Sequence, residues 1–176
     1  MDSKPQPAAN SFQQKLIRYL EYNEERKAKA MLFNPNQGNL LLKVIPYLLH
    51  CNYPDLPGFV NDAECPYGIH LFNSKEFSYE LFLRYFPTST AMRADRPSPF
   101  TGKPCIHSLK TIGSIGTIAQ SAISDCDYWV SIRKEELGEK GLRLLQEKCK
   151  GIEEWALKRG SEVHFFLMDT EQTREN

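Results

Sequence analysis

The chain has 176 residues and a formal net charge of zero, with 22 basic and 22 acidic side chains. Hydrophobic residues make up 41% of it, which is enough for a core and excludes wholesale disorder. The balanced charge gives no strong field for nucleic acid or for an anionic membrane. No apolar run approaches the roughly 20 residues of a membrane span, and the N-terminus lacks the apolar segment of a secretory signal. The sequence therefore predicts a soluble, cytoplasmic protein without a membrane span, which is not expected to bind nucleic acid.

The first half of the chain has a helical pattern. Residues 1–10 are polar and proline-rich, which predicts a disordered tail. A helix is expected from Ser11 to the turn residues 34–38, because apolar side chains recur at helical spacing at Phe12, Leu16, Tyr19 and Leu20. A second helix is expected over residues 39–50, with Pro46 inside it or ending it.

A loop-rich stretch follows, and then a short strand or buried extended segment over residues 69–72. Residues 74–86 have the spacing of a helix, and a polar, proline-rich linker runs from 87 to 103. We place the main boundary at this linker. A helical N-terminal region with its linker, residues 11–103, is thus expected to precede an α/β core, residues 104–176.

In the core, the expected strands and helices are clearly separated along the sequence. Strands are expected over residues 105–112, 125–132 and 162–168, because these segments are short and rich in apolar, β-branched and aromatic side chains. Gly113-Ser114 is a turn, residues 115–122 are expected to form a short helix, and residues 135–159 a long amphipathic one. The fold class that follows is α/β (α+β).

Five cysteines are spread along the chain without a Cys-x-x-Cys pair. A zinc site formed by Cys51, Cys65, His70 and Cys105 would fit no standard ligand spacing. Reduced and mostly buried thiols are therefore the prediction.

Two carboxylates carry the strongest chemical signal. Asp125 and Asp127 are two residues apart on an expected strand, so both side chains project from the same face. Their Cα atoms would be about 7 Å apart. Carboxylates this close repel each other unless a cation lies between them, and magnesium takes oxygen ligands that it shares with phosphates. A solvated pair of ordinary aspartates at a strand edge is the alternative.

The turn at Gly113-Ser114 lies upstream of this pair and is expected to lead from a strand into a helix. Glycine allows the backbone to approach a ligand closely, and the start of a helix offers free N–H groups to a phosphate. A third carboxylate would complete a two-metal site for phosphoryl chemistry. Glu162 begins the last expected strand and is preferred. The alternatives are Asp169, which ends that strand on the opposite face, or neither of the two residues.

These residues resemble a known group. Gly-Ser, ten residues and then Asp-x-Asp are similar to the nucleotidyltransferase superfamily typified by DNA polymerase beta. TIGSIGTIAQSAISDCDYWVSI, residues 111–132, resembles in more detail the catalytic segment of class I adenylate cyclases, the enterobacterial type. Further similarity covers residues 46–60, 66–72 and 144–169.

The resemblance implies a polymerase beta-like nucleotidyltransferase core with a mixed sheet. It implies that Gly113 and Ser114 hold the phosphates of ATP and that Mg²⁺ or Mn²⁺ binds Asp125, Asp127 and Glu162. Further supports or ligand contacts would be Gln120, Ser121 and Ser124. Trp129 would lie beside the nucleotide or serve as a core or rim aromatic, and Lys110 and Arg133 would contact phosphate or be solvated charges.

The implied reaction is the cyclisation of ATP to cyclic AMP and pyrophosphate. Class I cyclases are several times longer, so we expect a fragment of a longer enzyme or a short paralogue, with a downstream regulatory region or a partner protein. Two alternatives stay open. The chain transfers a nucleotide to another acceptor, or it is an inactive nucleotide-binding or regulatory module whose residues 11–86 form an interaction surface.

Overall fold

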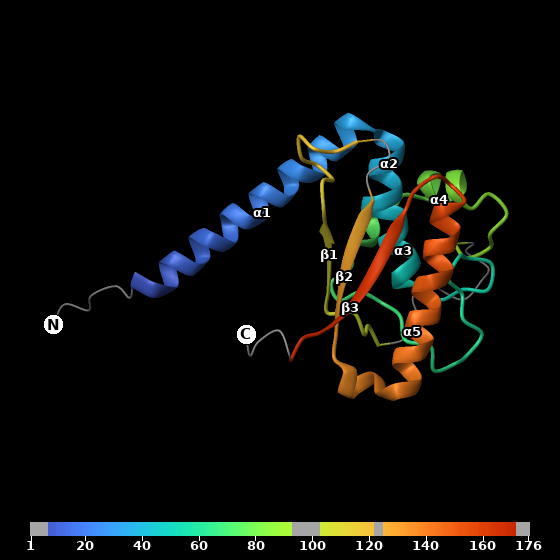
Figure 1. Cartoon of the computed structure of the whole chain (residues 1–176). Coiled ribbons are helices and arrows are strands. Elements are labelled where there is room, and N and C mark those ends of the chain that lie inside the picture. Colours follow the sequence, from blue (N-terminus) through green and yellow to red (C-terminus); the bar gives the residue numbers. More distant parts are fainter. Residues whose placement is uncertain (1–6, 93–102, 122–124, 172–176) are drawn as a thin grey trace.

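The computed structural model describes residues 7–92, 103–121 and 125–171. Its centre is a mixed three-stranded sheet in the order β1-β2-β3, formed by Ser108–Ile112, Cys126–Ile132 and Val163–Asp169. β1 is antiparallel to β2, and β2 is parallel to β3. The long helix α5, Lys134–Leu157, connects the two parallel strands (Figure 1). The predicted α/β class and mixed sheet are confirmed.

Helices dominate the N-terminal half. α1 spans Pro7–Phe33, and α2 (Pro35–Asn39), the π-helical segment η1 (Leu40–Val44) and α3 (Ile45–His50) follow without a loop. A 3₁₀ turn, η2 (Ser74–Glu76), precedes α4 (Tyr79–Tyr85). The helices expected here are confirmed, with the one over 74–86 split in two. The turn expected at 34–38 is wrong, because residues 35–39 form α2, which Asn34 caps by accepting the amides of Asn36 and Gln37. Pro46 lies in the first turn of α3, where its missing N–H leaves no hydrogen bond unmade.

One face of the sheet forms the hydrophobic core. The inward side chains of β2 are fully or almost fully buried: Cys126, Tyr128, Val130 and Ile132. They belong to one apolar cluster with Leu48 of α3, Phe82 of α4 and Ile152 of α5. Helical segments from the first half of the chain therefore share a core with the sheet.

The first part of α1 extends away from this body (Figure 1). Its apolar side chains are 44 to 69% exposed at Phe12, Leu16, Ile17, Tyr19 and Leu20. Ala30, near the C-terminal end of α1, is completely buried. The helix therefore contacts the body through its last turns. The apolar stripe predicted from the sequence lies mostly in the earlier, exposed part of the helix.

The prediction of a short helix over residues 115–122 is wrong for the residues that the structure describes, because residues 115–121 form successive turns. Gly116 has a φ of +70°, which is incompatible with a right-handed helix. Thr117 donates its hydroxyl to the Ser114 carbonyl at 2.6 Å and accepts the amide of Ala119 at 3.2 Å. Such side-chain hydrogen bonds compete with the helical pattern.

Other expectations differ in detail. Residues 69–72 contribute one isolated parallel bridge, between Ile69 and Ile106, rather than a strand. Asp125 and Glu162 each lie one residue before the strand that was expected to contain them. Of the tail expected at 1–10, residues 1–6 lie outside the described residues, and residues 7–10 belong to α1 instead. The linker residues 93–102 also lie outside the described residues. In the described part, no helix is long and apolar enough to cross a membrane.

Candidate active site

The acidic pair lies at the start of β2. Asp125 immediately precedes the strand and is exposed, and Asp127 within it is half-buried. Their alternation places both side chains on the face opposite to the core, together with Trp129, which is 42% exposed. In the part of the chain described, neither carboxylate makes a hydrogen bond or an ion pair with another residue.

The Gly-Ser turn lies directly beside this pair. Ile112 at the end of β1 is the register partner of Asp127, so the chain turns at Gly113 next to the acidic residues. Gly113 has a φ of +114°, and a Cβ built on it would be 3.7 Å from the backbone oxygen of Asp125. The left-handed conformation favours glycine here, and the turn carries the half-buried Ser114 alongside the aspartates.

Glu162 reaches the same end of the sheet from β3. Its carbonyl accepts the amide of Cys126 at 3.1 Å, which places it beside Asp125. Strand alternation puts its side chain on the face of the acidic pair. His164, the register partner of Asp127, shares this face, and its Nε2 lies 3.2 Å from Oε1 of Glu162. Sequence reasoning missed His164, although its spacing of two from Glu162 was a usable signal.

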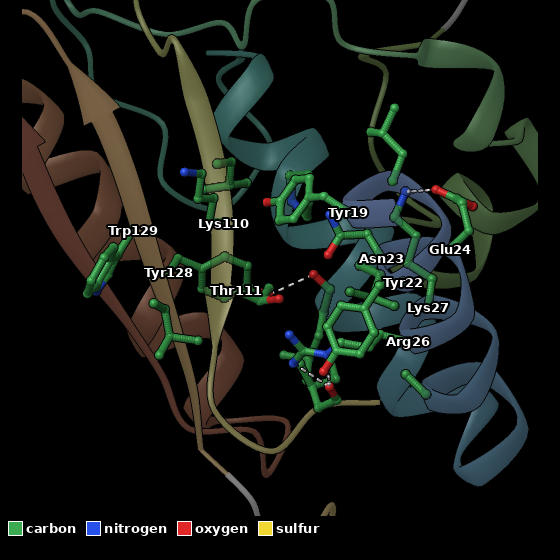
Figure 2. Close-up of a pocket in the computed structure, with 18 residues that line it drawn as sticks. Tyr19, Tyr22, Asn23, Glu24, Arg26, Lys27, Lys110, Thr111, Tyr128 and Trp129 are labelled. Carbon is green, nitrogen blue, oxygen red and sulfur yellow. Dashed lines mark hydrogen bonds and ion pairs between the residues drawn. The ribbon is translucent and has the colours of Figure 1, made fainter. Parts of the chain in front are cut away.

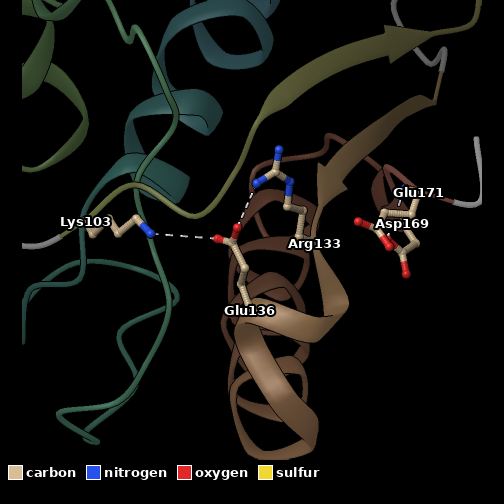
Figure 3. Close-up of polar contacts among 5 residues, drawn as sticks. All are labelled: Lys103, Arg133, Glu136, Asp169 and Glu171. Atoms are coloured by element: carbon tan, nitrogen blue, oxygen red, sulfur yellow. Dashed lines mark hydrogen bonds and ion pairs between the residues drawn. The ribbon is translucent and has the colours of Figure 1, made fainter. Parts of the chain in front are cut away.

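Asp169 is at the other end of β3, where its register partner in β2 is the buried Ile132. Figure 3 shows it beside Glu171 and near a charged group in which Arg133 Nη1 contacts Glu136 at 2.8 Å and Lys103 lies 3.9 Å from the same carboxylate. The structure therefore separates Asp169 and Arg133 from the Gly-Ser turn. Lys110 is exposed on β1, opposite Trp129.

The chemistry of the acidic pair fits a hard cation. Two carboxylates that share a face and lack a partner within the described chain offer oxygen ligands of the kind that magnesium takes. No group of three His, Cys, Asp or Glu side chains is, however, arranged to hold a metal among the described residues. In this arrangement the Glu162 carboxylate contacts His164 instead of joining the pair.

The cysteines form no such site either. All five are free thiols, and four of them are buried, so the predicted reduced and mostly buried thiols are confirmed. Burial raises the pKa of Cys51, Cys105 and Cys149 to about 12, which keeps these groups protonated.

The Gly-Ser loop, residues 113–121, is held by the N-terminal helices. Gln120 is buried, and its Oε1 accepts the amide of Gly116 at 2.7 Å while its Nε2 donates to Gln37 of α2 at 2.9 Å. Gln37 in turn donates to the carbonyl of the half-buried Ser121 at 3.4 Å. Ser124 lies outside the described residues.

A separate groove of about 500 Å³ lies between α1 and β1 (Figure 2). Tyr19, Asn23 and Lys27 line it from α1, and Leu109 and Thr111 line it from β1. The acidic pair, Glu162 and the loop residues Gly113, Ser114, Gln120 and Ser121 do not line this groove, but Lys110 and Trp129, the candidate phosphate and nucleotide contacts, do. Gly113 and Asp125 are exposed, and Ser114 and Asp127 are half-buried.

The comparisons with known proteins decide the family. A family model described as the adenylate cyclase NT domain matches residues 11–176.

The chain belongs to this family.

The resemblance of residues 111–132 to class I adenylate cyclases is thereby confirmed. The adenylate cyclase of Yersinia pestis is 34% identical over 155 residues, which cover 88% of this chain and 18% of the relative. That of Escherichia coli strain K12 is 35% identical over 154 residues, with the same coverage, 88% and 18%. That of Pasteurella multocida is 32% identical over 162 residues, or 92% and 19%. The chain thus spans less than a fifth of these curated relatives, and no solved structure matches it.

Proposed function

We propose that the chain is a nucleotidyltransferase core of the polymerase beta type that converts ATP to cyclic AMP and pyrophosphate. The observation that carries this proposal is the juxtaposition of the Gly-Ser turn and the acidic pair, with Gly113 against the Asp125 backbone and Ile112 opposite Asp127. The relatives, which are adenylate cyclases, supply the reaction.

In this reaction the ribose 3′-oxygen forms a bond to the α-phosphorus. The bond from the α-phosphorus to the bridging oxygen breaks, pyrophosphate leaves, and the hydroxyl proton passes to solvent. Gly113 would allow close approach of the triphosphate, and the Ser114 hydroxyl would donate to it. Gln120 and Ser121 would support the turn rather than contact the nucleotide, because the Gln120 amide already hydrogen bonds to Gly116 and Gln37.

A divalent cation, Mg²⁺ or Mn²⁺, would be held by Asp125 and Asp127 with Glu162 as the third carboxylate. When bound, such an ion lowers the pKa of the attacking hydroxyl and neutralises the leaving group. The protein's own part is to keep the carboxylates on neighbouring strands of one rigid sheet. Glu162 would have to leave His164 to join them.

The test is incubation with ATP and either magnesium or manganese, followed by identification of the product. Cyclic AMP is expected from the wild-type chain and not from Asp127→Asn. Glu154→Gln, at an exposed position of α5, is the matched control for the loss of one carboxylate and should retain turnover. A nucleotidylated acceptor would instead support transfer to another group. Cyclic AMP formation at the wild-type rate by Asp127→Asn would refute the proposed site.

One observation favours a second candidate function. Since the chain spans less than a fifth of its relatives, residues that complete catalysis can belong to the remaining part of those enzymes. The chain would then be a nucleotide-binding module that acts with a downstream region or partner protein. Calorimetric binding of ATP in the presence of magnesium, without product, would favour this function.

A further inference from the structure

Arg26 of α1 joins the N-terminal helix to the Gly-Ser loop (Figure 2). Its Nε donates to the carbonyl of Ile115 at 3.2 Å, and its Nη2 donates to the same carbonyl at 2.7 Å. Nη2 also donates to the carbonyl of Gly113 at 3.2 Å, 87 residues further along the chain. One guanidinium therefore holds the carbonyls on both sides of Ser114.

Gly116 makes the second contact between the loop and α1. A Cβ at this position would lie 2.2 Å from the backbone oxygen of Arg26, so the loop backbone rests directly on the helix. Any larger residue would push the two apart. The contact is reinforced from α2, where Gln37 hydrogen bonds to Gln120 and to the carbonyl of Ser121.

The loop depends on these contacts because no helix follows the turn. Residues 115–121 are turns, so a hydrogen-bonded helix does not fix the conformation of Gly113 and Ser114. The two carbonyls that Arg26 binds are turned toward α1. A carbonyl oxygen facing a triphosphate would repel it, so their orientation matters for binding an anion.

The charge of Arg26 is not paired with a carboxylate of the residues that the structure describes. Within the described residues its guanidinium contacts backbone carbonyls and the ring of Tyr22, whose centroid is 5.9 Å away, rather than a carboxylate. A half-buried cation beside the turn raises the local potential for an anionic ligand.

We propose that Arg26 is a positioning residue for the triphosphate-binding turn. It fixes the backbone of Gly113, Ser114 and Ile115 through its fork of donors, and α1 is thereby part of the active-site scaffold. This inference rests on the proposed function, since it takes nucleotide phosphates to bind at the turn.

Three substitutions separate the hydrogen bonds from the charge. Arg26→Ala removes both, Arg26→Lys keeps the charge but cannot reproduce the planar fork, and Arg18→Ala removes an exposed charge from the same helix as a control. The measurements are hydrogen exchange of the amides of residues 113–121 and calorimetric affinity for ATP with magnesium. Thermal unfolding identifies variants that lose the whole fold.

Arg26→Ala and Arg26→Lys are both expected to raise exchange in the loop and to weaken ATP binding, by about tenfold for Arg26→Ala. Arg18→Ala should change neither. Unchanged loop exchange in Arg26→Ala, or wild-type affinity in both Arg26 variants, would overturn the inference. If Arg26→Ala fails to fold, Arg26→Lys alone decides by the same two measurements. Failure of the wild-type chain to bind ATP would overturn the proposed function instead, and the loop exchange would still show whether Arg26 holds the turn.

Discussion

Ile112, the last residue of β1, lies opposite Asp127 in the antiparallel register of β1 and β2. This pairing brings a turn and an acidic pair to one end of the sheet, although ten residues separate Ser114 from Asp125 in the sequence. The parallel register of β2 and β3 adds Glu162 and His164 to the same end. The candidate site is therefore a consequence of two strand registers.

The first prediction concerns the choice of third carboxylate. Glu162→Gln should lower metal-dependent turnover by about 100-fold, because the residue lies beside Asp125 on the face of the acidic pair. Asp169→Asn removes a carboxylate at the other end of the same strand and should leave the rate within about twofold. Initial rates of cyclic AMP formation check both. The reverse pattern would assign the role to Asp169.

Strand alternation explains why the acidic pair could be predicted from the sequence. The spacing of Asp125 and Asp127 fixes their common face once a strand is assumed, and Gly113 marks a position of positive φ. The helices were predictable for a similar reason, because an apolar stripe has a period that local sequence reveals.

The Arg26 contact could not be predicted, since no local pattern links a helix residue to a carbonyl 87 positions later. The same contact explains the helix wrongly expected at 115–122. Gly116 adopts a φ of +70° where it meets the α1 backbone, so tertiary packing overrides the local preference. The exposure of Phe12 and Leu16 could not be predicted either. Periodicity shows which side chains share a face of a helix, but it does not show whether another element covers that face.

The second prediction concerns the contact between Gly116 and α1. Gly116→Ala should destabilise the fold by about 3 kcal/mol or more, because it combines an unfavourable positive φ with a clash against the Arg26 backbone oxygen. Gly160→Ala is the matched control. Its φ is +75°, but a Cβ there meets nothing within 4 Å, so only the conformational cost of about 1 kcal/mol is expected. Urea titrations followed by circular dichroism would measure both, and equal losses would argue against the tight contact.

The third prediction concerns the link between β2 and the helical segment η1. The buried Tyr128 hydroxyl donates to the carbonyl of Leu41 at 2.6 Å. Tyr128→Phe should lower the free energy of unfolding by about 1–2 kcal/mol, since this buried acceptor then loses its donor. Tyr79→Phe, at a side chain that is 53% exposed, should change it by less than about 0.5 kcal/mol. A Tyr128→Phe protein as stable as the wild type would show that the bond contributes nothing.

The last prediction concerns Lys148, which is almost completely buried in α5 and donates to the carbonyl of Gly58 at 3.2 Å. Burial lowers its pKa below the ordinary value of 10.5. Between the lowered pKa and 10.5, the unfolded chain binds a proton that the folded chain does not, so the Lys148 contribution to stability rises with pH across this window. Below the window, the folded protein bears the full cost of burying the charge.

Lys148→Met removes this pH dependence while keeping most of the side-chain volume. The variant should therefore gain most over the wild type at low pH, and the gain should decline by up to about 1.4 kcal/mol per pH unit across the window. The thiols titrate in the opposite sense, because burial raises the pKa of Cys51, Cys105 and Cys149 to about 12. They are present in both proteins, but the Lys148 charge lowers their pKa, so the difference between the two unfolding free energies reports the lysine together with its coupling to these thiols. Denaturant titrations at several pH values up to 10.5 provide it, and a difference independent of pH would contradict the lowered pKa of Lys148.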